Sequence, residues 1–222
     1  MTSVSKKEAL ALLKKYMVNQ HVMEHVMAVH DYAMEIAAEV ECDRGLVEAG
    51  SLLHDIGRSR SHGIDHAIIG AEILKKEGVD GRIVSIVERH IGAGLTAREA
   101  KKLGLPPKDY APRTIEEKIV CHADNLIGST ERVSIRDTIA MARMKWFPES
   151  VDRLITMHFD VFKPDIVFLK ENAPDDINAV LNDFDLLYKV SHENGKYALS
   201  LYGQDSKKAA KYLLDKGVAE RH

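Results

Sequence analysis

The chain has 222 residues, enough for one domain of ordinary size or for one domain with a small appendage. It is 45% hydrophobic and 29% charged, with a formal net charge of −3, which excludes a disordered chain and a general nucleic-acid binder. Its two cysteines, Cys42 and Cys121, are far apart and make neither a zinc ribbon nor a disulfide framework.

Targeting signals are not evident in the sequence. No apolar run approaches the roughly 20 residues that span a bilayer, and residues 1–15 lack the apolar stretch and cleavage site of a signal peptide. We therefore expect a cytoplasmic protein without a membrane partner.

The first two thirds of the chain carry a helical pattern. Apolar residues recur at steps of three and four from Ser5 to about Ala142. We expect Asp43 to be an N-cap, and Gly78 and Gly104 to end helices. The expected helices cover residues 5–18, 21–40, 44–54, 64–77, 80–90, 96–103, 114–128 and 131–143.

The last fifty residues have a different pattern. After a helix at 149–161, an apolar piece at 166–169 and a connector at 172–175, two β-prone runs follow at 186–191 and 197–202. Asn194-Gly195 between the runs is a strong hairpin signal. A helix at 206–216 ends at Gly217. We predict an all-α bundle over 1–172 and a C-terminal hairpin-plus-helix extension over 173–222.

His54 and Asp55 are the most informative pair. An apolar helix ends in these two residues, and Gly57 lets the chain turn away sharply. A buried aspartate is costly unless it is paired with a cation or well hydrogen-bonded. An imidazole and a carboxylate at one helix end can bind a divalent ion, and the second carboxylate oxygen can bridge to another.

Two further residues lie on apolar helix faces. His25 shares the apolar stripe of its helix, and Asp124 has Val120, Ala123 and Ile127 at helical spacing. Each alone is compatible with a hydrogen-bonded core residue. Together with His54 and Asp55 they give the order histidine, His-Asp pair, distal aspartate.

This order resembles the HD superfamily of metal-dependent phosphohydrolases over roughly residues 20–145. His54-Asp55-Ile56-Gly57 spells the motif of the HDIG subgroup. The resemblance implies an all-α HD bundle in which His25, His54, Asp55 and Asp124 hold one metal ion.

The resemblance also implies a second ion. His66 stands in a stretch similar to the subgroup's second-histidine helix, and His90 stands where members with two metals carry a further histidine. Asp55 would bridge the two ions. Ile91 replaces a tandem histidine of many relatives, which argues against a third ion.

The implied cofactor is one or two divalent ions. Imidazole and carboxylate ligands suit Mn, Fe, Co, Ni, Zn or, less comfortably, Mg. A metal pair would activate a water and neutralise phosphate oxygens during displacement. His54 and Asp55 are therefore the expected catalytic residues, and Arg58 is a candidate phosphate clamp with the alternative of a surface cation. His66 and His90 could instead surround a one-metal site.

The remaining histidines are expected outside the site. His21 and His30 are predicted to lie off the apolar stripe of their helix, and His122 is predicted to face away from Asp124. His62 belongs to a polar loop, where Arg60 is a further candidate for contact with a phosphate. His158, His192 and His222 fall in the C-terminal third.

The function that follows is hydrolysis of a phosphomonoester or phosphodiester of a nucleotide or related small phosphorylated molecule. The alternatives are an enzyme acting on RNA ends or cyclic phosphates, a non-catalytic metal- or nucleotide-binding regulatory module, and an oxygenase with a di-iron site. The acidic net charge disfavours long nucleic acid as a partner. The C-terminal extension can cover the site, cap the bundle or form a homo-oligomer contact.

Overall fold

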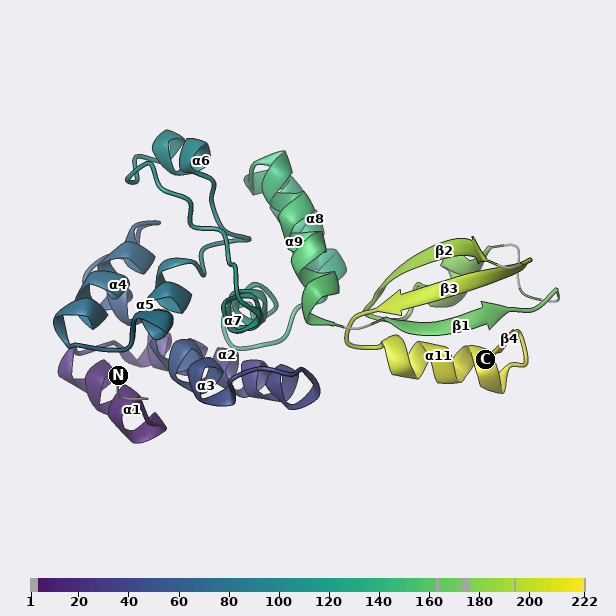
Figure 1. The fold of residues 1–222 in the computed structure, drawn as a ribbon, viewed down its shortest axis with the longest axis horizontal. Helices are drawn as coiled ribbons and strands as arrows, with labels where there is room; N and C mark the ends of the chain where they lie inside the picture. Colours follow the sequence, from purple (N-terminus) through teal and green to yellow (C-terminus); the bar gives the residue numbers. More distant parts are fainter. Residues whose placement is uncertain (1–3, 163, 172, 174–175, 194, 222) are drawn as a thin grey trace.

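A computed structural model describes residues 4–162, 164–171, 173, 176–193 and 195–221. A helical bundle occupies the N-terminal part, and a small unit of strands and helices follows it (Figure 1). The mostly helical fold with a C-terminal β extension is confirmed, although the extension is larger than a hairpin and one helix. In the described residues, no helix is both long and apolar enough to cross a membrane.

Within the described residues, the bundle contains ten helical elements. They are α1 (Lys6–Lys15), α2 (Gln20–Glu39), α3 (Arg44–Leu53), the 3-10 helix η1 (Ile56–Ser59), α4 (His66–Lys76), α5 (Gly81–Glu88), α6 (Ala97–Lys102), α7 (Ile115–Asn125), α8 (Ile135–Lys145) and α9 (Pro148–Val161).

Local capping explains several of these boundaries. The Asp43 carboxylate accepts hydrogen bonds from the backbone N–H groups of Gly45 and Leu46, as an N-cap should. Gly78 and Gly104 have φ angles of 72° and 77°, the left-handed conformation that ends a helix. The predicted helix at 131–143 begins later, at Ile135, because the Ser134 hydroxyl caps the backbone N–H of Asp137.

The helix predicted over 114–128 stops earlier than expected. α7 ends at Asn125. Beyond it, Ile127 forms an isolated antiparallel bridge with Arg132, so the chain turns back in a short loop. The core of the bundle lies between α2, α3, α5 and α7, where Val26, Leu52 and Ile119 are fully buried.

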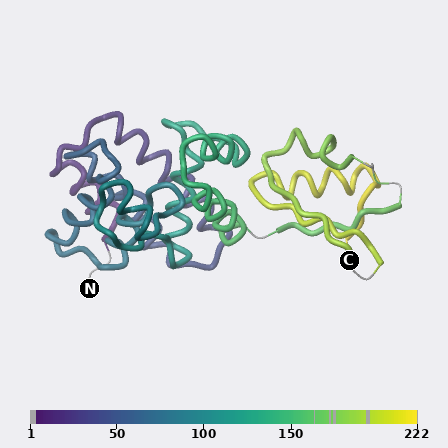
Figure 2. Tube along the Cα trace, turned by 90° about the horizontal axis from the view of Figure 1, so that it is seen from above, coloured from purple at the N-terminus to yellow at the C-terminus, as the bar shows by residue number. Residues whose placement is uncertain are grey.

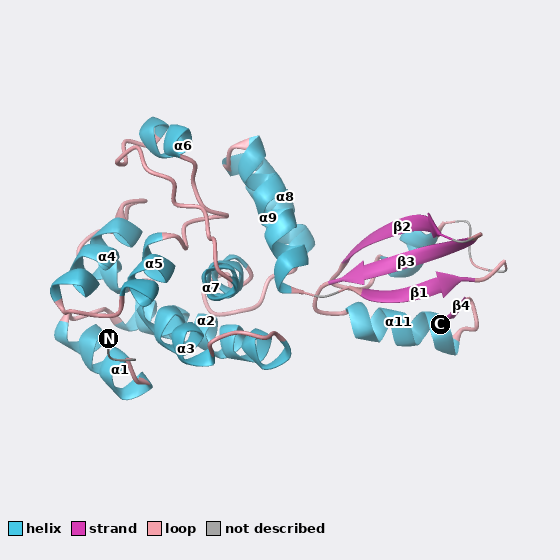
Figure 3. Ribbon diagram, viewed as in Figure 1, coloured by secondary structure: helices cyan, strands magenta, loops and turns pink. Residues whose placement is uncertain are grey.

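The C-terminal unit contains a four-stranded antiparallel sheet. Its elements in chain order are β1 (Asp165–Leu169), α10 (Ile177–Leu181), β2 (Leu187–Glu193), β3 (Lys196–Tyr202), α11 (Ser206–Asp215) and β4 (Ala219–Glu220). The strand order is β2-β3-β1-β4. Figure 3 shows the strands gathered in this unit alone.

The predicted hairpin is confirmed as β2 and β3, and the predicted last helix is confirmed as α11. The apolar piece at 166–169 is a strand, whereas α10 and β4 were not expected. Most of the predicted connector at 172–175 and the predicted turn residue Asn194 lie outside the described residues. The division at residue 172 stays a prediction, although β1, on its N-terminal side, pairs with β3.

Polar contacts join the two units, which lie end to end in Figure 2. The backbone N–H of Ile135 donates to the Asp185 carboxylate at 3.0 Å. The Arg136 guanidinium donates to the carbonyl oxygens of Leu181, Asn182 and Leu186. The start of α8 is therefore bound to the C-terminal unit.

A buried histidine pair lies where α7, α9 and the sheet meet. His122 Nε2 and His158 Nδ1 are 2.8 Å apart, and both side chains are buried. His122 thus faces away from Asp124 as predicted. Burial lowers the pKa of both rings, that of His158 to about 4. His30 was predicted to lie off the apolar stripe, and this was wrong: it is buried against Lys6 and Ser51.

The His122–His158 pair predicts a loss of stability in acid. A histidine whose pKa is lowered by folding takes up a proton more readily in the unfolded chain than in the folded one. The free energy of unfolding therefore falls as the pH drops from 6.5 towards 4. Between pH 6.5 and 5.0 His158 should contribute a loss of about 1.5 kcal/mol. Urea unfolding at both pH values measures this loss. The change in unfolding free energy between the two pH values should be smaller in His158→Leu than in the wild type by that amount, whereas the exposed control His21→Gln should match the wild type. An unchanged dependence in His158→Leu would contradict this assignment.

Gly57 predicts a second, steric effect on stability. A Cβ atom there would lie 1.9 Å from the carbonyl oxygen of His66 and 2.7 Å from the amide nitrogen of Gly70, both rigid backbone atoms. Gly57→Ala should therefore lower the free energy of unfolding by about 2 kcal/mol or more. At Gly81, an added Cβ meets nothing within 4 Å, so Gly81→Ala is the matched control and should not destabilise the chain. Equal urea midpoints for the two variants would refute the close packing of η1 on α4.

Candidate metal centre

The site begins at the end of α3. His54 caps this helix and is fully buried, and Asp55 follows it with 2% of its side chain exposed. His54 Nδ1 lies 2.7 Å from the carbonyl oxygen of Ser51, one turn back. This hydrogen bond makes Nδ1 the donor and turns the free Nε2 towards the interior of the bundle.

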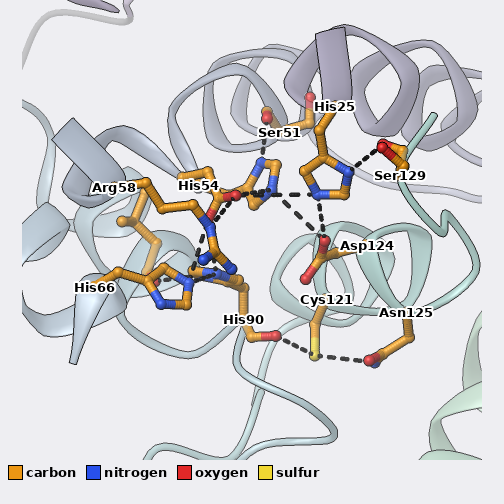
Figure 4. A network of polar contacts seen from close by, with 12 residues as sticks. His25, Ser51, His54, Arg58, His66, His90, Cys121, Asp124, Asn125 and Ser129 are labelled. Atoms are coloured by element: carbon orange, nitrogen blue, oxygen red, sulfur yellow. Dashed lines mark hydrogen bonds and ion pairs between the residues drawn. The ribbon is translucent and has the colours of Figure 1, made fainter. Parts of the chain in front are cut away.

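Two further helices bring His25 and Asp124 to the same place. His25 comes from α2 and Asp124 from the end of α7 (Figure 4). The Asp124 Oδ1 atom lies 3.0 Å from His25 Nε2 and 3.6 Å from His54 Nε2. The Asp55 Oδ2 atom is 4.0 Å from His25 Nε2 and 3.8 Å from His54 Nε2. His25, His54 and Asp55 thus bring their ligand atoms together as one group, and Asp124 adjoins this group through its contacts with the two histidines.

The other oxygen of Asp55 faces a second group. His66 from the first turn of α4 and His90 just beyond α5 place their Nε2 atoms 3.1 Å and 3.6 Å from Asp55 Oδ1. The two Nε2 atoms are 3.0 Å apart. Two clusters therefore meet at Asp55, one with His25 and His54 and one with His66 and His90.

All four rings are held in the same way. The Nδ1 atoms of His66 and His90 lie 2.7 Å from the carbonyl oxygens of Gly63 and Val87, three residues earlier. His25 Nδ1 lies 2.9 Å from the carbonyl oxygen of Ser129. Because each Nδ1 donates its hydrogen to a backbone carbonyl, each Nε2 keeps a lone pair that can bind a metal ion. Metal-ligating histidines usually have such an acceptor at the other ring nitrogen.

The buried polar atoms suit a divalent ion. His54 Nε2 and Asp55 Oδ1 are buried without a hydrogen-bond partner of good geometry, a costly state unless something else satisfies them. A divalent ion would satisfy both, and the donor set of imidazole nitrogens and carboxylate oxygens fits one.

The electrostatics favour ionised carboxylates. Burial alone would raise the pKa of Asp55, but the surrounding imidazoles of His54, His66 and His90 hold this pKa well below its usual range. The pKa of Asp124 is lowered as well: burial would raise it, but the close contact with His25 and the nearby rings of His54 and His90 outweigh burial. Burial lowers the pKa of His54 to about 4, which keeps this ring neutral at pH 7.

Arg58 contacts the centre through Asp55. Its Nε atom donates to Asp55 Oδ2 at 2.5 Å, and 30% of its side chain is exposed. The guanidinium therefore neutralises the carboxylate shared by the two clusters. Arg60, the other arginine of this loop, lies with its guanidinium 5.6 Å from the ring centre of Tyr16, on the side of α1.

The sequence did not reveal the supporting contacts. Asn125 Nδ2 and Cys121 Sγ both donate to the carbonyl oxygen of Gly92, at 2.6 Å and 3.0 Å, and so fix the loop that follows His90. Ser129 supports His25 through its carbonyl oxygen only. Backbone acceptors leave no signature in the side-chain sequence, whereas Asn125 could have been noticed as a polar neighbour of Asp124.

Comparisons with known proteins agree with this geometry. The family model described as "HD domain" matches residues 22–128. An uncharacterized protein of Methanocaldococcus jannaschii is 50% identical over 161 residues, covering 69% of this chain and 95% of that protein. A tRNA (cytidine(56)-2'-O)-methyltransferase of Thermoplasma volcanium is 48% identical over 149 residues, 67% of this chain but 44% of the relative. Ribonuclease Y of Acidothermus cellulolyticus is 33% identical over 111 residues, 49% of this chain and 19% of the relative.

The geometry predicts metal binding that depends on Asp55. Asp55→Ala removes the carboxylate that both clusters share, so metal content after loading with Mn²⁺ or Co²⁺ and desalting should fall to near zero, while His66→Ala should retain the ion of the other cluster. The exposed His62→Ala is the control and should bind as the wild type does. Elemental analysis measures the content, and a fully loaded Asp55→Ala variant would contradict the shared role of this residue.

Proposed function

Because this chain belongs to the HD-domain family, we propose that it is a metal-dependent phosphohydrolase acting on a phosphomonoester or phosphodiester of a nucleotide or related small phosphorylated molecule. The observation that carries the proposal is the Asp55 carboxylate between two histidine clusters, each with Nε2 atoms turned inwards. Membership in the HDIG subgroup stays a prediction, as does a cytoplasmic location.

The proposed ligands follow the two clusters. His25, His54, Asp55 and Asp124 would hold one divalent ion, and Asp55, His66 and His90 would hold a second. When bound, such ions supply a water of lowered pKa and positive charge for the phosphate oxygens. The chain's own contribution is to fix the rings through Nδ1 and to keep both carboxylates ionised, so that the ligand atoms are ready without reorganisation.

Arg58 has a proposed role in substrate binding. Its ion pair with Asp55 supplies the positive charge that the carboxylate requires. A bound ion would supply this positive charge instead, and the partly exposed guanidinium would then be available to bind a phosphate oxygen. We infer that Arg58 contributes more to substrate binding than to holding metal.

A second candidate function is that of a phosphodiesterase that acts on RNA. The relatives favour it, since one is a Ribonuclease Y and another a tRNA methyltransferase. The chain spans less than half of each of these proteins, so their substrates are proposals here. A regulatory module without catalysis is less favoured, because a degenerate site would have no need of all six ligands.

The test is metal-reconstituted hydrolysis. Stripped protein, reloaded separately with Mn, Co, Ni, Fe, Zn or Mg, would be assayed on generic phosphomonoesters and phosphodiesters, a nucleotide panel and short RNA. We expect turnover that needs metal and falls by at least about 100-fold in Asp55→Asn, with Arg58→Ala raising KM more than it lowers kcat. His21→Gln is the control. Tight metal binding without turnover on any ester would overturn the hydrolase and favour the regulatory module.

A further inference from the structure

The His25 ring is held differently from the other three imidazoles of the metal centre. Each of those three places its Nδ1 atom 2.7 Å from a carbonyl oxygen three residues earlier in the chain. His25 Nδ1 instead lies 2.9 Å from the carbonyl oxygen of Ser129 (Figure 4). Ser129 belongs to the loop between α7 and α8, residues 126–134, here called the support loop. The orientation of His25 therefore depends on how the support loop is held.

The support loop is a closed turn between two helices. The Gly128 N–H donates to the carbonyl oxygen of Glu131 at 2.8 Å, and the Val133 N–H donates to the carbonyl oxygen of Leu126 at 2.9 Å. The second bond joins the two ends of the loop. The loop is therefore one compact piece, attached to α7 at its start and to α8 at its end, and a shift of the first turn of α8 displaces it.

Arg132 fastens the support loop to the helix that carries His25. Its guanidinium lies 4.3 Å from the ring centre of Tyr32 and pairs with the carboxylate of Glu35, and both of these residues belong to α2. Tyr32 is 4% exposed, and its hydroxyl donates to the side-chain oxygen of Gln204 at 3.4 Å. Because Gln204 lies between β3 and α11, the support loop, α2 and the C-terminal unit meet at this point.

Asp185 of the C-terminal unit provides a cap for α8. The N–H groups in the first turn of a helix have no partner within that helix. The N–H of Ile135, the first residue of α8, donates to Asp185 Oδ1 at 3.0 Å. A carboxylate at this end of a helix also interacts favourably with the helix dipole. Asp185 is held in turn by Asp205, whose carboxylate accepts its backbone N–H at 2.9 Å.

Arg136 makes the opposite contact, from α8 to the C-terminal unit. Its guanidinium donates, at 3.0–3.2 Å, to the carbonyl oxygens of Leu181 and Asn182 at the end of α10 and to that of Leu186. The last carbonyl groups of a helix also lack partners within it, and a cation is favourable there. Leu187, the next residue, packs against the core of the bundle. The start of α8 and the end of α10 thus cap each other's units, a contact here called the α8 junction.

We propose that the C-terminal unit positions one metal ligand: Asp185 and Arg136 fix the start of α8, α8 fixes the support loop, and the Ser129 carbonyl then orients His25. The inference rests on the metal centre of the proposed function. The rings of the other cluster have their acceptors three residues away and are independent of the α8 junction. Ser129 and the C-terminal unit both lie beyond residues 22–128, which the family model matches. The cluster of His25 is therefore completed by a part of the chain that the family model does not cover.

The experiment measures Co²⁺ affinity of the stripped full chain by calorimetric titration in two backgrounds. His66→Ala leaves the ion of the His25 cluster, and there Asp185→Ala should weaken Co²⁺ binding by about 10-fold, the usual effect of removing a contact that orients a metal-ligating histidine. In the His25→Ala background the junction has no ring left to orient, so Asp185→Ala should leave Co²⁺ affinity unchanged. A purely structural role would lower the affinity in both backgrounds.

Matched variants make the result specific. Asp185→Asn keeps an oxygen that can accept the Ile135 N–H and should restore most of the affinity, and Asp183→Ala removes a nearby exposed carboxylate and should have no effect. Arg136→Ala breaks the other half of the α8 junction and should give the same pattern as Asp185→Ala. Equal losses in both backgrounds, or full affinity in both junction variants, would overturn the proposal, as would a wild type that binds no Co²⁺. A chain that shows the expected pattern but cleaves no ester would contradict the proposed hydrolase alone.

Discussion

The structure depends on one buried carboxylate. Asp55 is 2% exposed, yet four imidazoles and one guanidinium converge on its two oxygens. An ionised group in such a place is stable only if cationic or hydrogen-bonding groups surround it. The groups at this site come from α2, α3, α4, the end of α5 and α7. The packing of these helices in the bundle therefore also sets the geometry of the site.

Much of this could be predicted from the sequence. The order and helical spacing of His25, His54, Asp55 and Asp124 identified side chains that the structure places together, because polar residues on apolar helix faces must find partners inside. His66 and His90 followed from resemblance alone. The ion pair of Arg58 with Asp55 was not foreseen, since a residue three positions away could equally have faced solvent.

Other features could not be read from local patterns. Ile127 and Val133 continue the apolar spacing around α7 and α8. The loop between them is fixed instead by backbone hydrogen bonds across it, such as the one from the Val133 N–H to the Leu126 carbonyl oxygen. The five residues of α10 and the two of β4 are too short for periodicity to detect. His122 and His158 lie 36 positions apart and meet only after α7 packs on α9.

The anchoring of the four imidazoles has a consequence for the order of folding. Three rings are tied to carbonyl oxygens three residues earlier, within their own helix ends, and His54, Asp55, His66 and His90 belong to one continuous stretch of 37 residues. That half of the centre needs only short loops to close. His25 instead requires Ser129, 104 positions away. One half of the centre can thus assemble while the nascent chain is still short, and the other half is completed only when the chain beyond α7 has been made.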